Sequence, residues 1–247
     1  MSRDVLGALA AALAPAGVNL VGVARSSDYD ARVPAERALA HLVPEAQSVV
    51  VIGNGGGAFW ASYRAACTRE PARTQVTDPL DAFTRETVTR AIGGLGVGGR
   101  IVFPFEFDTV PVSFMTLAAC AGLGTPSLLG VLVHPEWGPW MALRAAWFPP
   151  LALEAPRPAD GFDPCPTCVA RPCITACPTG AVGPAGWDVP RCVAYRLAPD
   201  GDDCALGCHA RLACVVGPEH RYPVEALAHH QGTARRRMAV AESKDDG

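Results

Sequence analysis

Hydrophobic positions in the first 150 residues switch between helical spacing and short apolar runs. Val5, Leu6, Leu9 and Leu13 recur at the spacing of an amphipathic helix, which Gly17 ends. The same reasoning predicts helices over residues 34–43, 58–69, 78–96 (with Asp78 as N-cap) and 110–124. Short apolar runs predict strands over residues 19–24, 48–53, 100–105, 127–134 and 141–148. This alternation predicts an α/β or α+β fold, and we expect α+β.

The pattern changes at "PPLALEAPRPADGFDP" (149–164), which holds five prolines and little periodicity. Such a stretch is typical of a linker or domain boundary. The short pieces that follow, rich in Cys, Pro and Gly, cannot build a large core, so we expect their fold to rely on metal. The sequence therefore predicts a first domain over residues 1–155, a second over 156–225, and a frayed charged tail over 226–247.

Composition narrows the possible classes of protein. The chain of 247 residues is 49% hydrophobic and 18% charged, which describes a globular protein with a real core. Its net charge of −3 does not favour a nucleic-acid partner, and no apolar run is long enough for a membrane span. With no signal peptide recognisable around Asp4, we expect a cytoplasmic protein. Disulfides are rare in the cytoplasm, so the ten cysteines indicate metal binding.

The cysteines are unevenly distributed. Cys67 and Cys120 stand alone, whereas eight others crowd together: Cys165, Cys168, Cys173, Cys177, Cys192, Cys204, Cys208 and Cys214. Eight thiolates are the number that two 4Fe–4S clusters need. The stretch "CPTCVARPCITACPTGAV" (165–182) is close to the bacterial ferredoxin run C-x2-C-x2-C-x3-C-P, although its middle gap holds four residues where two are expected.

Two structural zinc sites would also use eight thiolates, and they remain the alternative. The ending Cys177-Pro178-Thr179-Gly180-Ala181 favours clusters, because it resembles the end of a ferredoxin run. In two-cluster ferredoxins the fourth Cys of each run ligates the other cluster. That resemblance implies one set of Cys165, Cys168, Cys173 and Cys214, and another of Cys177, Cys192, Cys204 and Cys208.

Two longer stretches resemble epoxyqueuosine reductase. They are "FDTVPVSFMTLAACAGLGTPSLLGVLVHPEWGPW" (107–140) and "RCVAYRL" (191–197). The resemblance implies a cobalamin-dependent enzyme: a nitroreductase-like α/β/α sandwich followed by a small ferredoxin-like iron–sulfur domain. Two features of that family are missing. "TPSLL" (125–129) replaces its "WIGKN" loop, and the helical-repeat extension associated with tRNA handling is not recognisable.

A second resemblance is to the CblC-type cobalamin-processing proteins. It rests on "VTDPLDAFTRETVTRAI" (76–92) and "LGVLVHPEWGPWMALRA" (129–145). Reductive dehalogenases also combine such a cobalamin domain with two clusters. The three families imply one plan, in which a corrinoid sits on the nitroreductase-like domain and clusters supply its electrons.

Specific site residues follow from these resemblances. Asp108 matches the proton donor of epoxyqueuosine reductase, although an Asp here could also cap a helix starting near Val110. His134 could contact cofactor or substrate, or be structural. The segment 121–130 could contact the corrinoid, or simply end a helix; its candidate residues are Gly122, Gly124, Thr125, Ser127, Leu128 and Gly130.

The function expected from the sequence is an iron–sulfur reductase that passes electrons from two clusters to a cobalamin-type cofactor. Two alternatives stay open: an electron carrier or cobalamin chaperone without turnover, and an FMN-dependent reductase. The expected partners are the corrinoid, a small-molecule substrate and an electron donor such as ferredoxin or flavodoxin. The missing extension argues against tRNA as substrate.

Overall fold

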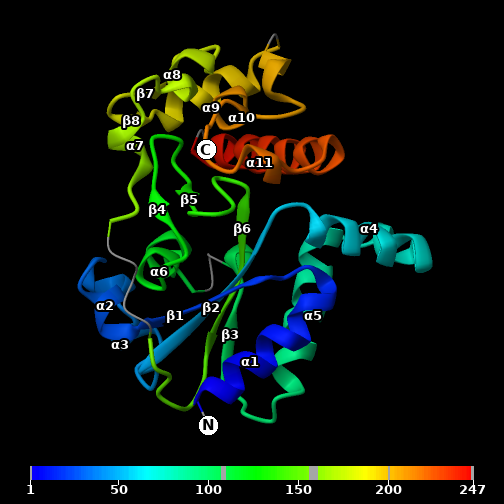
Figure 1. Cartoon of the computed structure of the whole chain (residues 1–247). Helices are drawn as coiled ribbons and strands as arrows, with labels where there is room; N and C mark the ends of the chain where they lie inside the picture. Colours follow the sequence, from blue (N-terminus) through cyan, green and yellow to red (C-terminus); the bar gives the residue numbers. More distant parts are fainter. Residues whose placement is uncertain (1, 107–109, 156–160, 200, 246–247) are drawn as a thin grey trace. The chain divides into compact units, whose positions relative to one another are not determined.

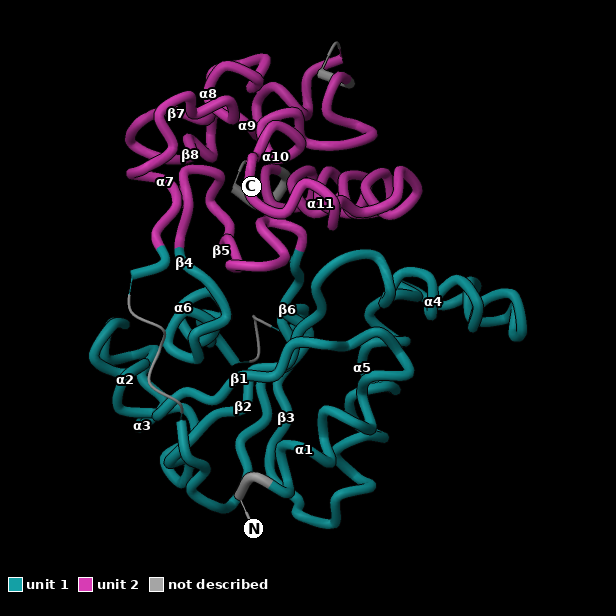
Figure 2. Tube along the Cα trace, viewed as in Figure 1, with its two compact units in different colours: residues 1–125, 141–162 teal, residues 126–140, 163–247 magenta. Residues whose placement is uncertain are grey.

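The computed structural model describes residues 2–106, 110–155, 161–199 and 201–245. The chain divides into two compact units, shown in teal and magenta in Figure 2. Unit 1 comprises Met1–Thr125 and Met141–Phe162, and unit 2 comprises Pro126–Trp140 and Asp163–Gly247. The segment 126–140 therefore belongs with the cysteine-rich half of the chain and not with the first 155 residues.

Unit 1 is built on one antiparallel sheet with the strand order β1-β2-β6-β3. Its strands are β1 (Leu20–Arg25), β2 (Ser48–Gly55), β3 (Arg100–Val102) and β6 (Met141–Phe148). Its helices are α1 (Ser2–Leu13), α2 (Ser26–Asp30), α3 (Leu39–Leu42), α4 (Ala58–Arg69), α5 (Pro79–Gly93) and α6 (Phe114–Cys120). Figure 1 shows helices on both sides of this sheet.

The burial of β2 explains the layered arrangement. Every residue of β2 is buried, as expected for a strand covered on both faces. Val50 and Ile52 join the main core with α1, α4 and α5. Val49 and Val51 point to the opposite face, because side chains alternate along a strand, and α6 packs against that face. Unit 1 is thus an α/β/α sandwich, as the sequence predicted.

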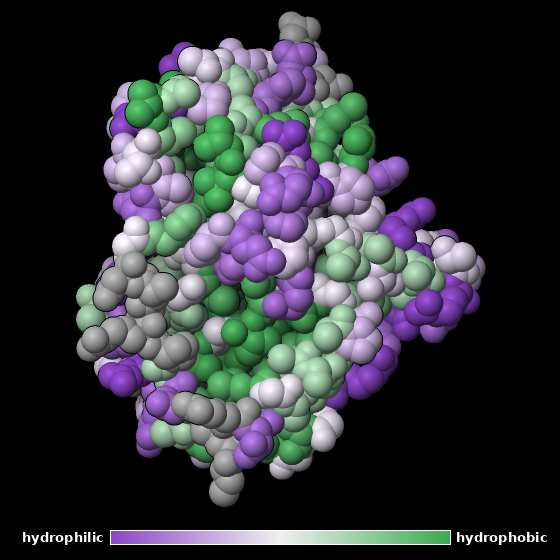
Figure 3. All heavy atoms as spheres, in the orientation of Figure 1, coloured by the Kyte–Doolittle hydropathy of each residue, from purple (hydrophilic) through white to green (hydrophobic). Residues whose placement is uncertain are grey.

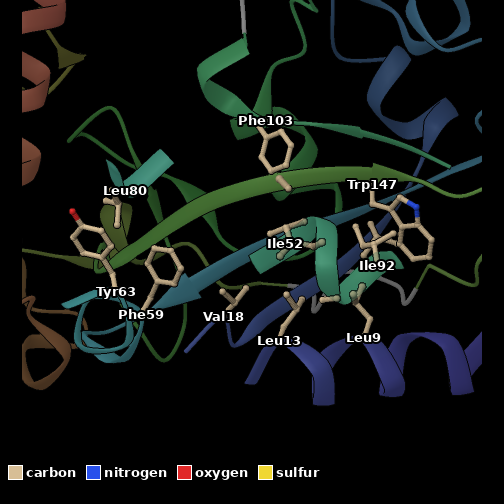
Figure 4. Close-up of a cluster of buried hydrophobic side chains, with 14 of the residues drawn as sticks. Leu9, Leu13, Val18, Ile52, Phe59, Tyr63, Leu80, Ile92, Phe103 and Trp147 are labelled. Carbon is tan, nitrogen blue, oxygen red and sulfur yellow. The ribbon is translucent and has the colours of Figure 1, made fainter. Parts of the chain in front are cut away.

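The main core of unit 1 joins residues from distant parts of the sequence. Figure 4 shows Leu9 and Leu13 of α1 directed toward Ile52 of β2 and Trp147 of β6. These four side chains have no solvent exposure. The surface over α4 mixes hydrophilic and hydrophobic residues in the space-filling view (Figure 3), because its exposed positions are alanines, arginines and a threonine.

Several predicted helices of unit 1 are shorter or more interrupted than the sequence pattern suggests. The helix predicted over 110–124 is only α6, because Pro111 precedes it and the Ser113 side chain accepts the Thr116 N–H at its N-terminus. The helix predicted over 34–43 is a 3-10 turn followed by α3, separated by the extended Ala38. Asp78 does occupy the N-cap position of α5, but its side chain makes no capping hydrogen bond.

Unit 2 consists of short elements and one long helix. Its strands are β5 (Leu132–Val133), β7 (Val182–Gly183) and β8 (Gly186–Trp187), and the unit begins within β4 (Thr125–Pro126). The helices are α7 (Pro164–Thr167), α8 (Pro172–Ala176), α9 (Val189–Leu197), α10 (His209–Leu212) and α11 (Val224–Asp245). The strand predicted over 127–134 is reduced to β5, because Ser127–Val131 forms a tight turn.

The predicted frayed tail over 226–247 was wrong for its described residues, which belong to α11. Ala226 and Leu227 are buried, and α11 packs against α9. These few apolar contacts order a helix whose sequence is otherwise charged. No helix in the described part of the chain is long and apolar enough to cross a membrane.

The chain reverses after α1 at Gly17, which has a φ of 74°. A Cβ there would lie 2.4 Å from the backbone nitrogen of Phe59. We expect Gly17→Ala to lower the free energy of unfolding by about 1–3 kcal/mol, because the left-handed backbone and the clash both oppose a side chain. Gly7→Ala is the control: Gly7 lies inside α1 with nothing within 4 Å of the added carbon, and it should be neutral or stabilising by about 1 kcal/mol. Urea unfolding measures both, and equal effects would contradict this account of Gly17.

Candidate metal centre

Four cysteines of unit 2, called set A here, surround one cavity. Cys165 lies in α7, Cys168 directly follows that helix, Cys173 lies in α8, and Cys214 follows α10. All four line a cavity of about 40 Å³. Because α7 and α8 have only four and five residues, set A is positioned by turns and not by long helices. The two additional residues of the sequence motif, Arg171 and Pro172, start α8 and leave Cys173 on the cavity wall.

The other four cysteines, called set B here, surround a second and larger cavity. Cys177 directly follows α8, Cys192 lies in α9, Cys204 ends a 3-10 turn, and Cys208 is the N-cap of α10. They line a cavity of about 260 Å³. Cys173 and Cys177 are four residues apart, yet they face different cavities. The structure thus groups the eight cysteines as the ferredoxin resemblance implies.

Thiols of the same set influence one another electrostatically. Burial raises the pKa of Cys173 and of Cys214, and the neighbouring thiols of set A raise both further. Burial likewise raises the pKa of Cys192 and of Cys204, with Cys208 adding to both. These four thiols therefore resist ionisation unless a cation compensates their negative charge.

Cys177 differs from these thiols. Burial alone raises its pKa, but hydrogen bonds from the backbone of Val182, from Thr179 and from the backbone of Ala181 outweigh this, so its pKa lies below the ordinary value. The Thr179 hydroxyl lies 3.7 Å from the Cys177 Sγ atom. The "CPTGA" ending thus supplies hydrogen bonds to a sulfur, the kind of contact that tunes a metal-bound thiolate.

The hairpin 126–140 contributes to both cavities. Ser127 and Leu128, predicted to contact a corrinoid, instead line the cavity of set A. Leu129 lines both cavities. Gly130 lies against Trp187, where an added Cβ would be 2.4 Å from the indole ring. The sequence did not predict Leu129 as a site residue, because an apolar residue in an expected strand gives no sign that it lines two cysteine cavities.

Gly122, Gly124 and Thr125 lie in unit 1, at the end of α6. The Leu123 N–H donates to the Ala118 carbonyl and the Gly122 N–H to the Ala119 carbonyl, which is the hydrogen-bond pattern of a Schellman motif. Gly122 has the positive φ, 71°, that this motif requires. The Thr125 hydroxyl donates to the Phe162 carbonyl. These contacts account for Gly122 as a helix C-cap.

His134 has a clear local role. Its Nδ1 accepts the N–H groups of Glu136 and Trp137 at 3.0 and 3.2 Å. Burial lowers the pKa of His134, consistent with a neutral ring that accepts hydrogen bonds at this nitrogen. These bonds shape the turn 134–138, which favours the structural interpretation.

Asp108 lies outside the described residues. Its alternative role as a helix N-cap is wrong, because Ser113 caps α6. Sequence reasoning also missed two arginines on the wall of the set B cavity, Arg196 and Arg211. In the motif "RCVAYRL" only the cysteine was predicted as a site residue. The burial of Arg196 depends on its packing against α11, which lies further along the chain.

The donor chemistry of both sets fits iron–sulfur clusters. Four soft thiols surround each cavity, and a cationic metal core would relieve the mutual repulsion of their thiolate forms. Among the described residues, no three or more His, Cys, Asp or Glu side chains converge closely enough to hold a single metal ion, so the fit rests on the donor type and on the grouping of the cysteines around the cavities.

Comparison with known proteins gives partial sequence matches. No family model matches the chain. The chain is 36% identical over 112 residues to the epoxyqueuosine reductase of Leadbetterella byssophila. This match covers 44% of this chain and 33% of that protein. The matches span a third or less of the first curated relatives.

Solved structures are similar over most of the chain. An epoxyqueuosine reductase has a TM-score of 0.61 at 16% identity, covering 92% of this chain and 69% of the other. The Caenorhabditis elegans B12-trafficking protein CblC has a TM-score of 0.60 at 12% identity, covering 93% and 91%. These similarities establish the fold and confirm the resemblance to both families that the sequence indicated.

One expectation from the sequence is overturned. We expected a small-molecule substrate and no nucleic-acid partner. The solved epoxyqueuosine reductase of this fold is in complex with an epoxyqueuosine-modified tRNA stem loop, so that expectation was wrong. Net charge averages over the whole surface and does not report on a local binding patch, so a value of −3 could not exclude RNA.

Arg211 connects the hairpin 126–140 to the rest of unit 2. Its guanidinium donates two hydrogen bonds to the Pro139 carbonyl and lies over the Trp140 ring. We expect Arg211→Met to lower the free energy of unfolding by about 1–3 kcal/mol, because a buried carbonyl loses its donors. Urea unfolding followed by tryptophan fluorescence would measure this loss.

The matched control is Arg236→Met, which removes an exposed arginine of α11. It should change stability by less than about 0.5 kcal/mol. Similar losses in the two variants would show that Arg211 contributes no more than an ordinary surface arginine.

Proposed function

We propose that this chain is an iron–sulfur reductase whose unit 2 holds two 4Fe–4S clusters. One observation carries the proposal: all eight cysteines of unit 2 fall into two groups of four around two cavities, with no cysteine left over. Cys165, Cys168, Cys173 and Cys214 would hold one cluster, and Cys177, Cys192, Cys204 and Cys208 the other.

The chain's own residues would prepare these sites. The hydrogen bonds to Cys177 favour its thiolate form before any metal arrives. Leu129 and Val131 add apolar side chains to the wall of the set B cavity. Bound clusters would supply one-electron transfer, the chemistry for which this class of cofactor is used.

The electron acceptor we propose is a cobalamin-type cofactor bound by unit 1. The support is the fold, which unit 1 shares with epoxyqueuosine reductase and with a B12-trafficking protein. The epoxyqueuosine base of a modified tRNA is the substrate that the sequence matches suggest.

The alternative is cobalamin processing or transport without a reaction on RNA. It is favoured by the coverage of CblC, of which this chain spans 91%. A flavin in place of the corrinoid is a further possibility, because nitroreductase-like folds can also hold FMN. Anaerobic purification with iron, sulfide, cobalamin and flavin analysis separates these options.

The cluster proposal predicts the iron content of cysteine variants. The wild-type protein, reconstituted anaerobically, should bind about eight iron and eight sulfide ions. Cys168→Ser in set A and Cys208→Ser in set B should each remove about half of both, because each variant takes a ligand from one cluster only. Chemical iron and sulfide assays and visible absorbance measure the outcome.

Unit 1 provides the controls for these variants. Cys67 and Cys120 are buried there and line neither cavity. Cys67→Ser and Cys120→Ser should keep the full iron content. Zinc without sulfide in the wild-type protein, or an equal loss of iron in all four variants, would overturn the cluster proposal.

Asp108 is proposed as the proton donor, following its match to the epoxyqueuosine reductase motif. Asp108→Asn should slow reduction of an epoxyqueuosine-modified stem loop by about 100-fold or more, because an amide cannot donate the proton. Iron content and the spectral change on titration with hydroxocobalamin should not change. Single-turnover kinetics with chemically reduced protein provide the measurement.

The matched control is Asp28→Asn, an exposed carboxylate of α2 that loses the same charge. Its rate should equal that of the wild type. An Asp108→Asn protein with the wild-type rate would remove Asp108 from the reaction. Unchanged hydroxocobalamin spectra together with bound FMN would exclude the corrinoid.

A further inference from the structure

Arg196 is a buried cation on the wall of the set B cavity. It lies in α9, one helical turn after Cys192, and only 7% of its surface is exposed. The same cavity wall carries all four cysteines of set B. Arginine is charged at any pH that a folded protein withstands, so its charge must be compensated by its surroundings.

The guanidinium of Arg196 forms hydrogen bonds to neutral groups. One guanidinium nitrogen donates to the Gln231 carbonyl at 2.8 Å, and the other lies 3.7 Å from the Met238 sulfur. Within the described part of the chain, no carboxylate forms an ion pair with it. These contacts orient the guanidinium but leave its positive charge without a counter-charge from a carboxylate.

A cluster held by the four thiolates of set B would provide the missing negative charge. Arg196 shares the wall of the set B cavity with Cys192 and Cys204, two of the proposed cluster ligands. The positive charge of Arg196 therefore lies beside the space that the cluster would occupy. A four-thiolate 4Fe–4S cluster is an anion, and one-electron reduction makes it more negative by one charge.

We propose that Arg196 raises the reduction potential of the cluster held by set B, by stabilising the additional negative charge of its reduced form. This inference rests on the proposed function, because it requires that cluster. A buried, fixed positive charge acts more strongly than an exposed one, because water does not screen it. Arg196 is thus a tuning residue and not a ligand.

A purely structural role is the competing explanation, since the bond to Gln231 links α9 to α11. Substitutions that keep or remove the positive charge of Arg196 distinguish the two roles. Arg196→Met and Arg196→Gln remove the charge, whereas Arg196→Lys keeps it and changes the hydrogen bonding. If the charge sets the potential, Lys should behave like Arg, and both neutral variants should differ from them.

The experiment is a redox titration followed by electron paramagnetic resonance. The Cys168→Ser background leaves only the set B cluster and so assigns its signal. In that background Arg196→Met and Arg196→Gln should shift the midpoint potential to more negative values, while Arg196→Lys should stay near the parent. Arg236→Met, which removes an exposed arginine of α11, should leave the potential unchanged.

The possible failures are distinct. A cluster that is retained in both neutral variants with an unchanged potential would overturn this inference alone. An equal shift in the Lys and Met variants would assign the effect to packing and also overturn it. A wild-type protein without iron and sulfide would overturn the proposed function and this inference together.

Discussion

The electrostatic cost of ionising closely spaced, partly buried thiols is the constraint on which unit 2 depends. Burial already raises the pKa of Cys173, Cys192, Cys204 and Cys214, and neighbouring thiols raise it further. Helices of four or five residues supply little apolar surface to hold such groups together. A unit of this kind is stabilised by the group that its ligands bind, which couples its folding to its cofactor.

The same constraint explains why the hairpin 126–140 joins unit 2, although it lies between strands of unit 1 in the sequence. Leu129 lines both cavities, Ser127 and Leu128 line the cavity of set A, and Arg211 holds Pro139. Apolar residues placed between two thiol sets lower the local dielectric constant and exclude water. In such surroundings one buried charge, that of Arg196, has a large effect on a neighbouring anion.

Unit 1 follows a different principle, because it is stabilised by its apolar core. β2 is buried on both faces, and helices from three separate stretches of sequence contribute Leu9, Phe59 and Ile92 to one cluster. The fold of unit 1 resembles that of a B12-trafficking protein. Of the residues predicted to contact a corrinoid, Gly122 is the C-cap of a helix and Ser127 accepts and donates hydrogen bonds within the hairpin 126–140.

The sequence by itself determined the local elements and the identity of the thiols. Periodicity located α1, α4 and β2 to within a few residues, and the ferredoxin resemblance divided the cysteines as the cavities do. Only the tertiary structure decided the rest. Tertiary packing stabilises α11 through the burial of Ala226 and Leu227, and it places residues 126–140 in unit 2. It also buried Arg196, because its surroundings come from α11, far along the chain, and no local pattern encodes such contacts.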